Sequence, residues 1–284
     1  MAAPTPPGAG EVEARLADAF LADAFLAACR AELVALKPGN VHVHAPGHRM
    51  TVADFETSAA VAAPFIARRG ARVGRRVREA MAATVAAVGT NTNLGILLLA
   101  APMLAASERG GAFRPALEAV LRDLDIGDAE EVFAAIRVAS PAGLGDAERH
   151  DVTAPATVGL REAMAEAADR DRIARQYVTG FSDVLDLGLA EAEAARALGL
   201  PPEQVTTAVY FRFAGAFPDS HIVRKFGISA AEAVRRSFVE QAQSLRPYDH
   251  DALMTFDADL KARGLNPGTS ADLTVATELA LRIC

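Results

Sequence analysis

The stretch LGILLLAAPMLAA, Leu94 to Ala106, is the most apolar part of the chain and decides how the chain folds. At about 1.5 Å per residue it is too short to cross the ~30 Å of hydrocarbon in a bilayer. It therefore predicts a helix buried in a protein core, and we expect no membrane partner.

Helical periodicity extends over most of the remaining chain. Apolar residues recur at helical spacing from Val12 to Leu36, and Lys37-Pro38-Gly39 then ends that helix, because proline and glycine do not continue it. The same spacing predicts helices over residues 75–88, 94–106, 113–124, 129–138, 158–168, 173–198, 203–217, 251–263 and 270–283. Capping-box patterns predict helix starts at Thr51 with Asp54, Asp128 with Glu131, and Ser229 with Glu232. No segment alternates as a strand would, so we predict an all-α fold.

Composition favours a single compact multi-helix domain. Of the 284 residues, 51% are hydrophobic but only 6% are aromatic and none is Trp, so small aliphatic side chains let the helices approach closely. No Gly/Ser-rich or charged linker interrupts the sequence, which predicts one domain over residues 11–284. Residues 1–10 are rich in Pro and Gly and lack the features of a signal peptide, which predicts a disordered lead.

The charge balance limits the partners that we expect. The net charge is -7 and the pI is about 5.4, so no overall basic surface attracts nucleic acid or an anionic membrane. A polyanionic small molecule would instead need a local group of cations. The two cysteines, Cys29 and Cys284, form no CxxC pair and predict neither a disulfide nor a zinc site, which fits a reducing cytoplasm. The sequence leaves homo-oligomerisation open.

The first loop that could carry chemistry is Lys37-Pro38-Gly39-Asn40. A lysine on a stiff turn can bind phosphate, and an asparagine can orient a ribose hydroxyl or a phosphate oxygen. We therefore predict that Lys37 is exposed and that it binds substrate together with Asn40; an ordinary helix end is the alternative. His42, His44 and His48 follow at a spacing that could hold a metal. No cysteine or well-placed carboxylate completes a tetrahedral set, so we do not expect zinc.

A second polar loop, Gly89-Thr90-Asn91-Thr92-Asn93, separates two apolar helices. Burying these side chains without partners would cost roughly 1 to 3 kcal/mol for each unpaired group. A bound ligand would supply partners, which makes Asn91, Thr92 and Asn93 candidates for substrate binding. Helix capping is the alternative, and both roles are compatible because helix N-termini also bind phosphate.

A third loop runs from Ser140 to Asp146. Its glycines Gly143 and Gly145 free backbone N–H groups to approach an anion, although the sequence contains neither a P-loop nor a GxGxxG motif after a strand. The loop continues to Asp151, which is a candidate ligand for magnesium.

A fourth region is split between residues 218–227 and 266–272. Arg224 and Lys225 supply cations in an acidic protein, and a solvated helix face is the alternative for that pair. Acidic and polar side chains lie close to glycines in both segments. The candidates are Asp219, His221 and Asp272 for acid-base catalysis, Asp151, Asp219 and Asp272 for magnesium, and Asn266, Gly268 and Ser270 for substrate binding.

Five motifs occur in an order that resembles the triphosphoribosyl-dephospho-CoA synthase family. They are LKPGNV from Leu36, DFETSA from Asp54, VGTNTNLG from Val88, DSHIVRKFG from Asp219 and FDADLKARGLNPGTSADL from Phe256. The resemblance covers nearly the whole chain, and NPGTSADL is its most specific part. It implies a transferase in which adenine leaves C1 of the ribose of ATP and a ribose 2'-hydroxyl of dephospho-CoA takes its place.

The implied reaction makes four physical demands. It needs a clamp for a triphosphate, a base near the acceptor hydroxyl, an acid or hydrogen bond for the departing adenine, and exclusion of water from an oxocarbenium-like transition state. The four loops contain suitable residue types for each demand. Mg²⁺, bound with ATP as the substrate, is the expected cofactor.

The chain also departs from the citrate lyase branch of this family. Asn93 and Leu94 stand where that branch has His and Lys, and the Asp of a His-Lys-Asp-Met element is missing around His48, Arg49 and Met50. The chain resembles more closely the branch of archaea and methylotrophic bacteria, whose members occur beside tetrahydromethanopterin and methylofuran biosynthesis. Two alternatives stay open: another nucleotide-dependent enzyme of one-carbon cofactor biosynthesis, or a helical nucleotide-binding protein without turnover.

Overall fold

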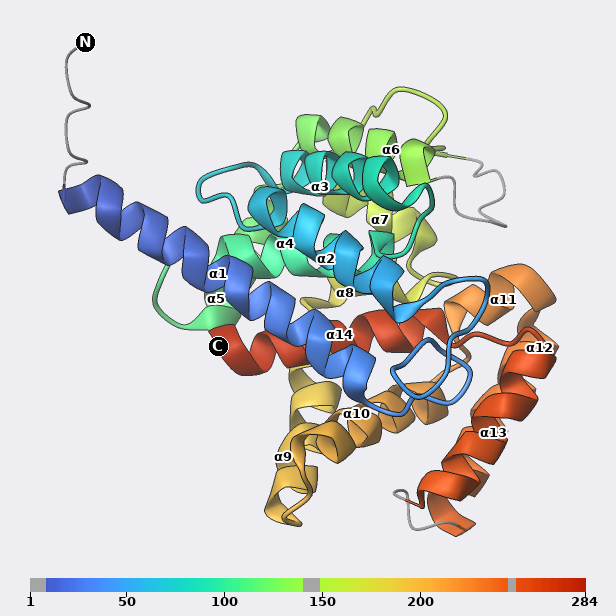
Figure 1. Ribbon diagram of the computed structural model, residues 1–284. Helices are drawn as coiled ribbons and strands as arrows, with labels where there is room; N and C mark the ends of the chain where they lie inside the picture. The colour runs from blue at the N-terminus through green and yellow to red at the C-terminus, as the bar shows by residue number, and fades with distance from the viewer. Residues whose placement is uncertain (1–8, 140–148, 245–248) are drawn as a thin grey trace.

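Fourteen α-helices and one π-helix, η1, make up the regular structure of residues 9–139, 149–244 and 249–284, which the computed structural model describes (Figure 1). They are α1 Ala9–Val34, α2 Val52–Ile66, α3 Val73–Val88, α4 Leu94–Ser107, α5 Phe113–Arg122, α6 Ile126–Ala139, α7 Leu160–Ala167, α8 Arg172–Thr179, η1 Asp183–Gly188, α9 Leu189–Ala197, α10 Pro202–Ala216, α11 Ser220–Phe226, α12 Ile228–Ser244, α13 His250–Ala262 and α14 Gly268–Ile283. No β-strand forms in these ranges, so the predicted all-α fold is confirmed. Within the same ranges, none of the helices has the length and apolar character needed to cross a membrane.

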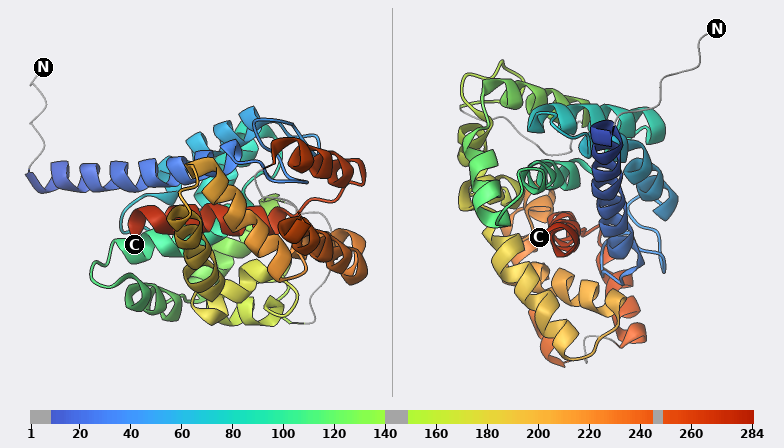
Figure 2. Two further views of the ribbon diagram at one scale, coloured as in Figure 1. Left: turned by 90° about the horizontal axis from the view of Figure 1, so that it is seen from below. Right: turned by 90° about the vertical axis from the view of Figure 1, so that its left-hand side faces the viewer.

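Helix α14 is the centre of the fold. It contacts α1, α4 and α10, and Figures 1 and 2 show it passing through the middle of the molecule. Eleven of its sixteen residues are buried, which is typical of a helix surrounded by others. Its buried hydroxyls are satisfied locally: Thr274 and Thr277 each donate to the backbone carbonyl four residues earlier.

Helix α4 confirms the prediction of a buried core helix. Leu97, Leu99, Met103 and Leu104 are fully buried, and Tyr177 of α8 donates a hydrogen bond of 2.7 Å to the carbonyl of Leu98. Because α4 and α14 pack together, the two most enclosed helices of the chain lie side by side. Both begin at the same cavity, which is described below.

Two apolar clusters build the core, and both include residues of α14. The larger cluster contains residues of all the helices from α1 to α10 and of α14. The smaller cluster contains Tyr210, Phe211, Phe238 and Phe256. These four rings meet edge to face with centroids 5.0 to 6.4 Å apart, a favourable arrangement for aromatic side chains. The sharing of α14 fits the predicted single domain.

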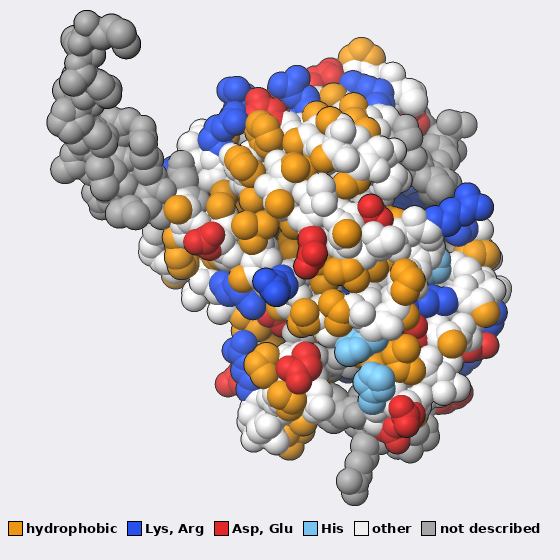
Figure 3. All heavy atoms as spheres, in the orientation of Figure 1, with side chains coloured by type: hydrophobic (Ala, Val, Ile, Leu, Met, Phe, Trp, Pro, Cys, Tyr) orange, Lys and Arg blue, Asp and Glu red, His pale blue; other side chains and the backbone are white. Residues whose placement is uncertain are grey.

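The face shown in Figure 3 carries acidic and basic side chains interspersed with apolar ones. No uniform basic surface covers this face, in agreement with the acidic net charge. A site for a polyanion on such a protein has to be local.

Three predicted elements differ in the structure. The helix predicted over residues 173–198 is divided, because Gly180 and Phe181 both have positive φ (63° and 62°) and end α8 before η1 and α9. The loop predicted over residues 218–227 contains α11. Residues 1–8 of the predicted lead lie outside the described residues, and α1 already begins at Ala9.

The three predicted helix starts had different outcomes. Thr51 and Asp54 form the expected capping box. The helix expected to begin at Asp128 begins at Ile126, and the Asp128 carboxylate instead accepts the backbone N–H of Gly74. Ser229 lies within α12, which begins one residue earlier.

Candidate active site

A cavity of about 610 Å³ opens where the loops selected from the sequence meet. Its volume is typical of small-molecule sites, roughly 300 to 1,000 Å³. Parts of α1, α2, α4, α6, α7, α8, α11 and α14 form its wall. Ten predicted residues line it: Asn40, Asn91, Thr92, Asn93, Asp151, His221, Arg224, Asn266, Gly268 and Asp272. Lys37, Asp219, Lys225 and Ser270 do not, and Gly143 and Gly145 lie outside the described residues.

The first turns of four helices, α4, α8, α11 and α14, reach the cavity wall. A helix start presents free backbone N–H groups and the positive end of the helix dipole, so their convergence favours an anion. The carboxylates of Asp171 and Asp219 cap α8 and α11. The starts of α4 and α14 are capped by residues outside their N-cap positions: Asn91 accepts the N–H of Leu94, and the Asp219 carboxylate accepts the N–H of Ser270. The start of α4 is capped by a neutral amide and not by a carboxylate, so among these four helices it offers the cavity the most positive end.

Asp272 on α14 faces the cavity at the point where α14 crosses α4. Gly95 of α4 lies directly opposite, because a Cβ added there would lie 2.6 Å from Cγ of Asp272. Only glycine leaves room for the carboxyl between the two helices. Burial and the nearby carboxylates of Glu32 and Asp219 raise the pKa of Asp272 well above its ordinary value. Its ionised form is therefore a stronger base than the carboxylate of an exposed aspartate.

Lys37 is buried, contrary to the prediction that its turn exposes it. Its ammonium group lies 2.6 Å from Oε1 of Glu32 and donates to Oδ1 of Asn40 at 3.2 Å and to the carbonyl of Val41. Three acceptors use the three donors of an ammonium group, so none remains for a substrate. Glu32 itself lines the cavity. Lys37 thus holds a carboxylate and an amide of the wall in place, and the predicted direct contact with substrate is corrected.

All four asparagines of the chain lie in the cavity wall. Asn40 donates to Oδ1 of Asn266 at 2.8 Å, which ties the loop after α1 to the turn before α14. Asn91 accepts the first N–H of α4 at 3.0 Å, and Asn93 donates to a buried threonine of α3 at 3.2 Å. Oδ1 of Asn93 has no hydrogen-bond partner within the described part of the chain. Because an amide both donates and accepts, these side chains suit base edges and ribose hydroxyls.

Asp219 does not face the cavity, because other protein groups occupy both of its carboxylate oxygens. Oδ1 accepts the backbone N–H of His221 at 2.9 Å. Oδ2 accepts the backbone N–H and the hydroxyl of Ser270, both at 2.8 Å. Asp219 therefore joins the starts of α11 and α14. This geometry corrects the prediction that Asp219 is a catalytic group or a magnesium ligand, and that Ser270 binds substrate.

His221 lies in the cavity wall at the start of α11 and against the start of α14. A Cβ at Gly268 would lie 2.7 Å from its Nδ1, so the missing side chain makes room for the ring. Burial and the positive charges of Arg224, Lys225 and His48 lower the pKa of His221 to about 4. The imidazole is therefore neutral at pH 7 and can hydrogen-bond, but it does not serve there as a charged acid.

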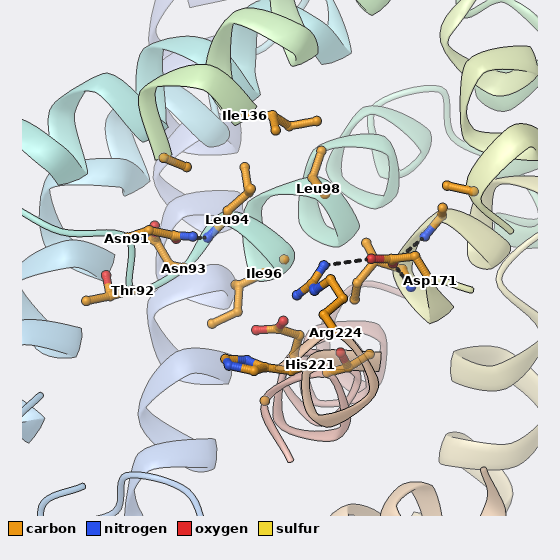
Figure 4. A pocket seen from close by; sticks show the side chains of 18 of the residues that line it. Asn91, Thr92, Asn93, Leu94, Ile96, Leu98, Ile136, Asp171, His221 and Arg224 are labelled. Atoms are coloured by element: carbon orange, nitrogen blue, oxygen red, sulfur yellow. Dashed lines mark hydrogen bonds and ion pairs between the residues drawn. The ribbon is translucent and has the colours of Figure 1, made fainter. Parts of the chain in front are cut away.

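Arg224 points into the cavity, as Figure 4 shows, and its Nη1 lies 2.9 Å from Oδ2 of Asp171. Lys225 is exposed instead, with its ammonium group 5.2 Å from the centre of the Phe226 ring. The two neighbouring cations thus have different environments. Arg224 faces the site as predicted, whereas the alternative of a solvated helix face is correct for Lys225.

Potential metal ligands are not clustered. Among the described residues, no group of three His, Cys, Asp or Glu side chains could hold a metal ion by itself. Asp151 and Asp272 line the cavity and Asp219 does not, so the predicted magnesium set is divided. Mg²⁺ commonly binds one or two carboxylates and completes its shell with substrate phosphates and water. The cavity carboxylates fit that mode, in which a nucleotide brings the remaining ligands.

The three histidines after α1 contact different partners. His42 is buried with Nε2 3.3 Å from Oδ1 of Asp257. His44 is exposed, and its ring centre lies 5.2 Å from that of His250. His48 lines the cavity, with Nε2 2.7 Å from the carbonyl oxygen of Gly39. Only His48 therefore belongs to the site.

The wall also contains charged residues that were not among the candidates chosen from the sequence. They are Glu32, Arg49, Arg149, Glu166, Arg170 and Asp171. Glu32 had a signal, because it interrupts the apolar face of α1 next to Cys29 and Leu33. Asp171 also had one, since an aspartate directly before a helical run is a typical N-cap.

Comparisons with known proteins support this description. Residues 18–283 match the family described as CitG, ATP:dephospho-CoA triphosphoribosyl transferase. The fold is similar to a crystal structure of a protein from Archaeoglobus fulgidus assigned as a triphosphoribosyl-dephospho-CoA synthase, with a TM-score of 0.63 and 25% sequence identity. That similarity covers 79% of this chain and 96% of the other. No curated protein matches the sequence.

The helical fold, the cavity with its polar loops and these matches define an enzyme that transfers a ribosyl group from a nucleotide. The chain belongs to the ATP:dephospho-CoA triphosphoribosyl transferase family. The resemblance inferred from the five motifs is thereby confirmed.

Proposed function

We propose that the cavity binds ATP and a CoA-like acceptor together, and that Asp272 removes the proton from the attacking hydroxyl. The observation that carries the proposal is the position of Asp272, beside the start of α4 and within the cavity. A base must lie where the anionic substrate is held, because the reacting C1 is joined to the triphosphate by a single ribose. The start of α4, which is capped by a neutral amide and not by a carboxylate, favours an anion at that place.

The chemical step exchanges one bond for another at C1 of the ribose. The bond from C1 to adenine breaks, and adenine leaves with its electron pair and takes up a proton. A hydroxyl oxygen of the acceptor bonds to C1, and its proton passes to the Asp272 carboxylate. The raised pKa of Asp272 makes its carboxylate a stronger base than an exposed aspartate. The neutral imidazole of His221 and the amides of the wall are suited to hydrogen-bond the adenine.

Magnesium is part of this proposal. Bound with the nucleotide, Mg²⁺ would neutralise charge on the triphosphate, and Asp272 and Asp151 are the predicted ligands that line the cavity. The roles of these two carboxylates separate experimentally, because a metal ligand changes the magnesium dependence of the rate whereas a base changes its pH dependence.

The side of the cavity across from Arg224 favours an acceptor with an apolar or amphipathic arm. Leu98, Ile136, Met164 and Ile173 line the wall formed by α4, α6, α7 and α8. Figure 4 shows Leu98 and Ile136 above Arg224, on the other side of the open space. A CoA-like molecule has both a phosphate end and a less polar arm, so it fits this division. The need for ATP and a CoA precursor also favours the cytoplasm as the place of action.

The test is product analysis by mass spectrometry with ATP, Mg²⁺ and dephospho-CoA. We expect free adenine and an acceptor that is heavier by a triphosphoribosyl group. One-carbon cofactor precursors, offered in separate reactions, test the alternative acceptor class. Absence of adenine release with every acceptor, from protein that binds ATP, would contradict the proposed function and favour a binding protein without turnover.

A further inference from the structure

In the described part of the chain, the guanidinium group of Arg224 has a hydrogen-bond partner on one side only. Nη1 donates to Asp171, whereas Nε is buried without a partner in the described part of the chain. Figure 4 shows Arg224 reaching from α11 into the cavity, with a dashed line that joins its guanidinium group to Asp171. Nε and Nη2 form the side edge of a guanidinium, with two N–H donors in parallel. That geometry matches two oxygens of one phosphate group.

Asp171 fixes the orientation of this edge. Its Oδ1 caps α8 by accepting the backbone N–H groups of Ile173 and Ala174 at 2.8 and 3.2 Å. Its Oδ2 then has a defined position, 2.9 Å from Nη1 of Arg224. The capping interaction thus holds the carboxylate, and the carboxylate holds the arginine. An arginine restrained in this way loses less side-chain freedom when a ligand binds.

The unpartnered Nε is an observation that points to a ligand. A buried donor without an acceptor costs free energy, and an oxyanion at the side edge would satisfy it. The start of α4 in the same wall, which is capped by a neutral amide, favours the same sign of charge. A carboxylate at Asp171 on the opposite edge prevents the guanidinium from turning away.

We propose that the Nε and Nη2 edge of Arg224 is a two-point binding site for a phosphate group, and that Asp171 is its positioning residue. The inference rests on the proposed function for its substrates. The phosphate comes either from the triphosphate of ATP or from the diphosphate of a CoA-like acceptor, and the chemistry of recognition is the same for both.

The experiment measures dissociation constants by calorimetry for inorganic tripolyphosphate, ATP and dephospho-CoA. The variants are Asp171→Ser, Arg224→Lys and the double variant. Serine retains the cap of α8 but its hydroxyl is too short to hold Arg224, and lysine retains the charge but lacks the planar edge. We expect each single variant to weaken binding about tenfold, which corresponds to one charge-assisted hydrogen bond. The compound whose affinity falls identifies the source of the phosphate.

The double variant separates positioning from a general structural effect. If Asp171 acts through Arg224, the double variant binds no more weakly than Arg224→Lys alone, and KM rises while kcat changes little. Asp249→Asn is the matched control, because Asp249 caps α13 through the N–H of Ala252 and does not line the cavity. That control should lower the melting temperature slightly and leave all three dissociation constants unchanged.

Two results would overturn the inference while leaving the proposed function intact. One is unchanged affinity for all three compounds in Asp171→Ser and Arg224→Lys, with adenine release retained. The other is a double variant whose dissociation constant rises by the product of the two single-variant factors, which would show that Asp171 acts independently of Arg224. If Arg224 and Asp171 are coupled in binding tripolyphosphate but no adenine is released, the phosphate site stands and the proposed function fails.

Discussion

Replacing Gly95 by alanine tests the geometry of the site without changing any charged group. The new Cβ would lie 2.6 Å from Cγ of Asp272. Carbon atoms in contact are about 3.5 to 4.0 Å apart, so the carboxyl or the helix start must move by about 1 Å. A displacement of this size in a catalytic group can reduce turnover by about 100-fold.

The same substitution should affect stability much less than turnover. Overpacking costs about 1 to 3 kcal/mol, and the higher helix propensity of alanine offsets up to about 1 kcal/mol of it. The remaining cost lowers the melting temperature of a chain of this size by a few degrees, at about 2 to 4 °C for each kcal/mol. The assays are adenine release at saturating substrates and thermal unfolding.

Gly215→Ala is the matched control, because Gly215 also lies within a helix, α10. A Cβ there meets only ordinary contacts, with Cγ2 of Val239 at 3.4 Å as the nearest atom. We expect this control to retain full turnover. If Gly95→Ala also retains turnover within severalfold of the unmodified enzyme, Asp272 does not act at the observed position and the mechanism is wrong.

Three further substitutions or titrations test individual groups. Asp272→Asn should reduce turnover at least ~100-fold. Because the pKa of Asp272 is raised in the folded protein, ionisation of this carboxyl destabilises the unmodified protein as pH rises. The variant cannot ionise there, so it should melt at a higher temperature than the unmodified protein at pH 8 and lose that advantage under acid conditions. Lys37→Ala should cost about 3 to 5 kcal/mol in urea unfolding, since Glu32 is left buried and unpaired, and a loss below about 1 kcal/mol would contradict the buried pair. The imidazole of His221 should titrate by NMR near pH 4, so its contribution to stability is present at neutral pH and is lost as pH falls; a midpoint near 6.5 would show that the ring is solvated.

The fold was largely predictable because its central helices have clear sequence signals. The run from Leu94 to Ala106 is apolar on every side, and a helix of that kind has to be enclosed by others. The division of residues 173–198 was not predictable from periodicity, because apolar spacing continues across Gly180. A single glycine within a helical pattern is often tolerated, and positive φ at Phe181 as well requires the surrounding structure to compensate.

The site was predictable as a set of loops but not residue by residue. Asp219 and Asp272 are both acids in specific motifs, yet the backbone N–H groups around Asp219 occupy its oxygens while Asp272 faces the cavity. Lys37 lies on a turn, but its partner Glu32 belongs to the preceding helix, and only packing shows that the pair is buried. Contacts across the chain decide these roles, and local patterns do not describe such contacts.

The concentration of all four asparagines in one cavity has a consequence for the lifetime of the enzyme. Asparagine is a thermolabile residue, and its slow hydrolysis leaves aspartate in its place. Elsewhere on the surface one added negative charge would change little, but here each event puts a carboxylate into the wall that must accept phosphate. Asn91 is the least buried of the four, and its oxygen accepts the first N–H of α4, a role that a carboxylate retains. Ageing at this residue therefore acts on substrate affinity before the fold. A stored sample that has gained about one mass unit within the peptide containing Asn91 should still melt normally and bind ATP less tightly.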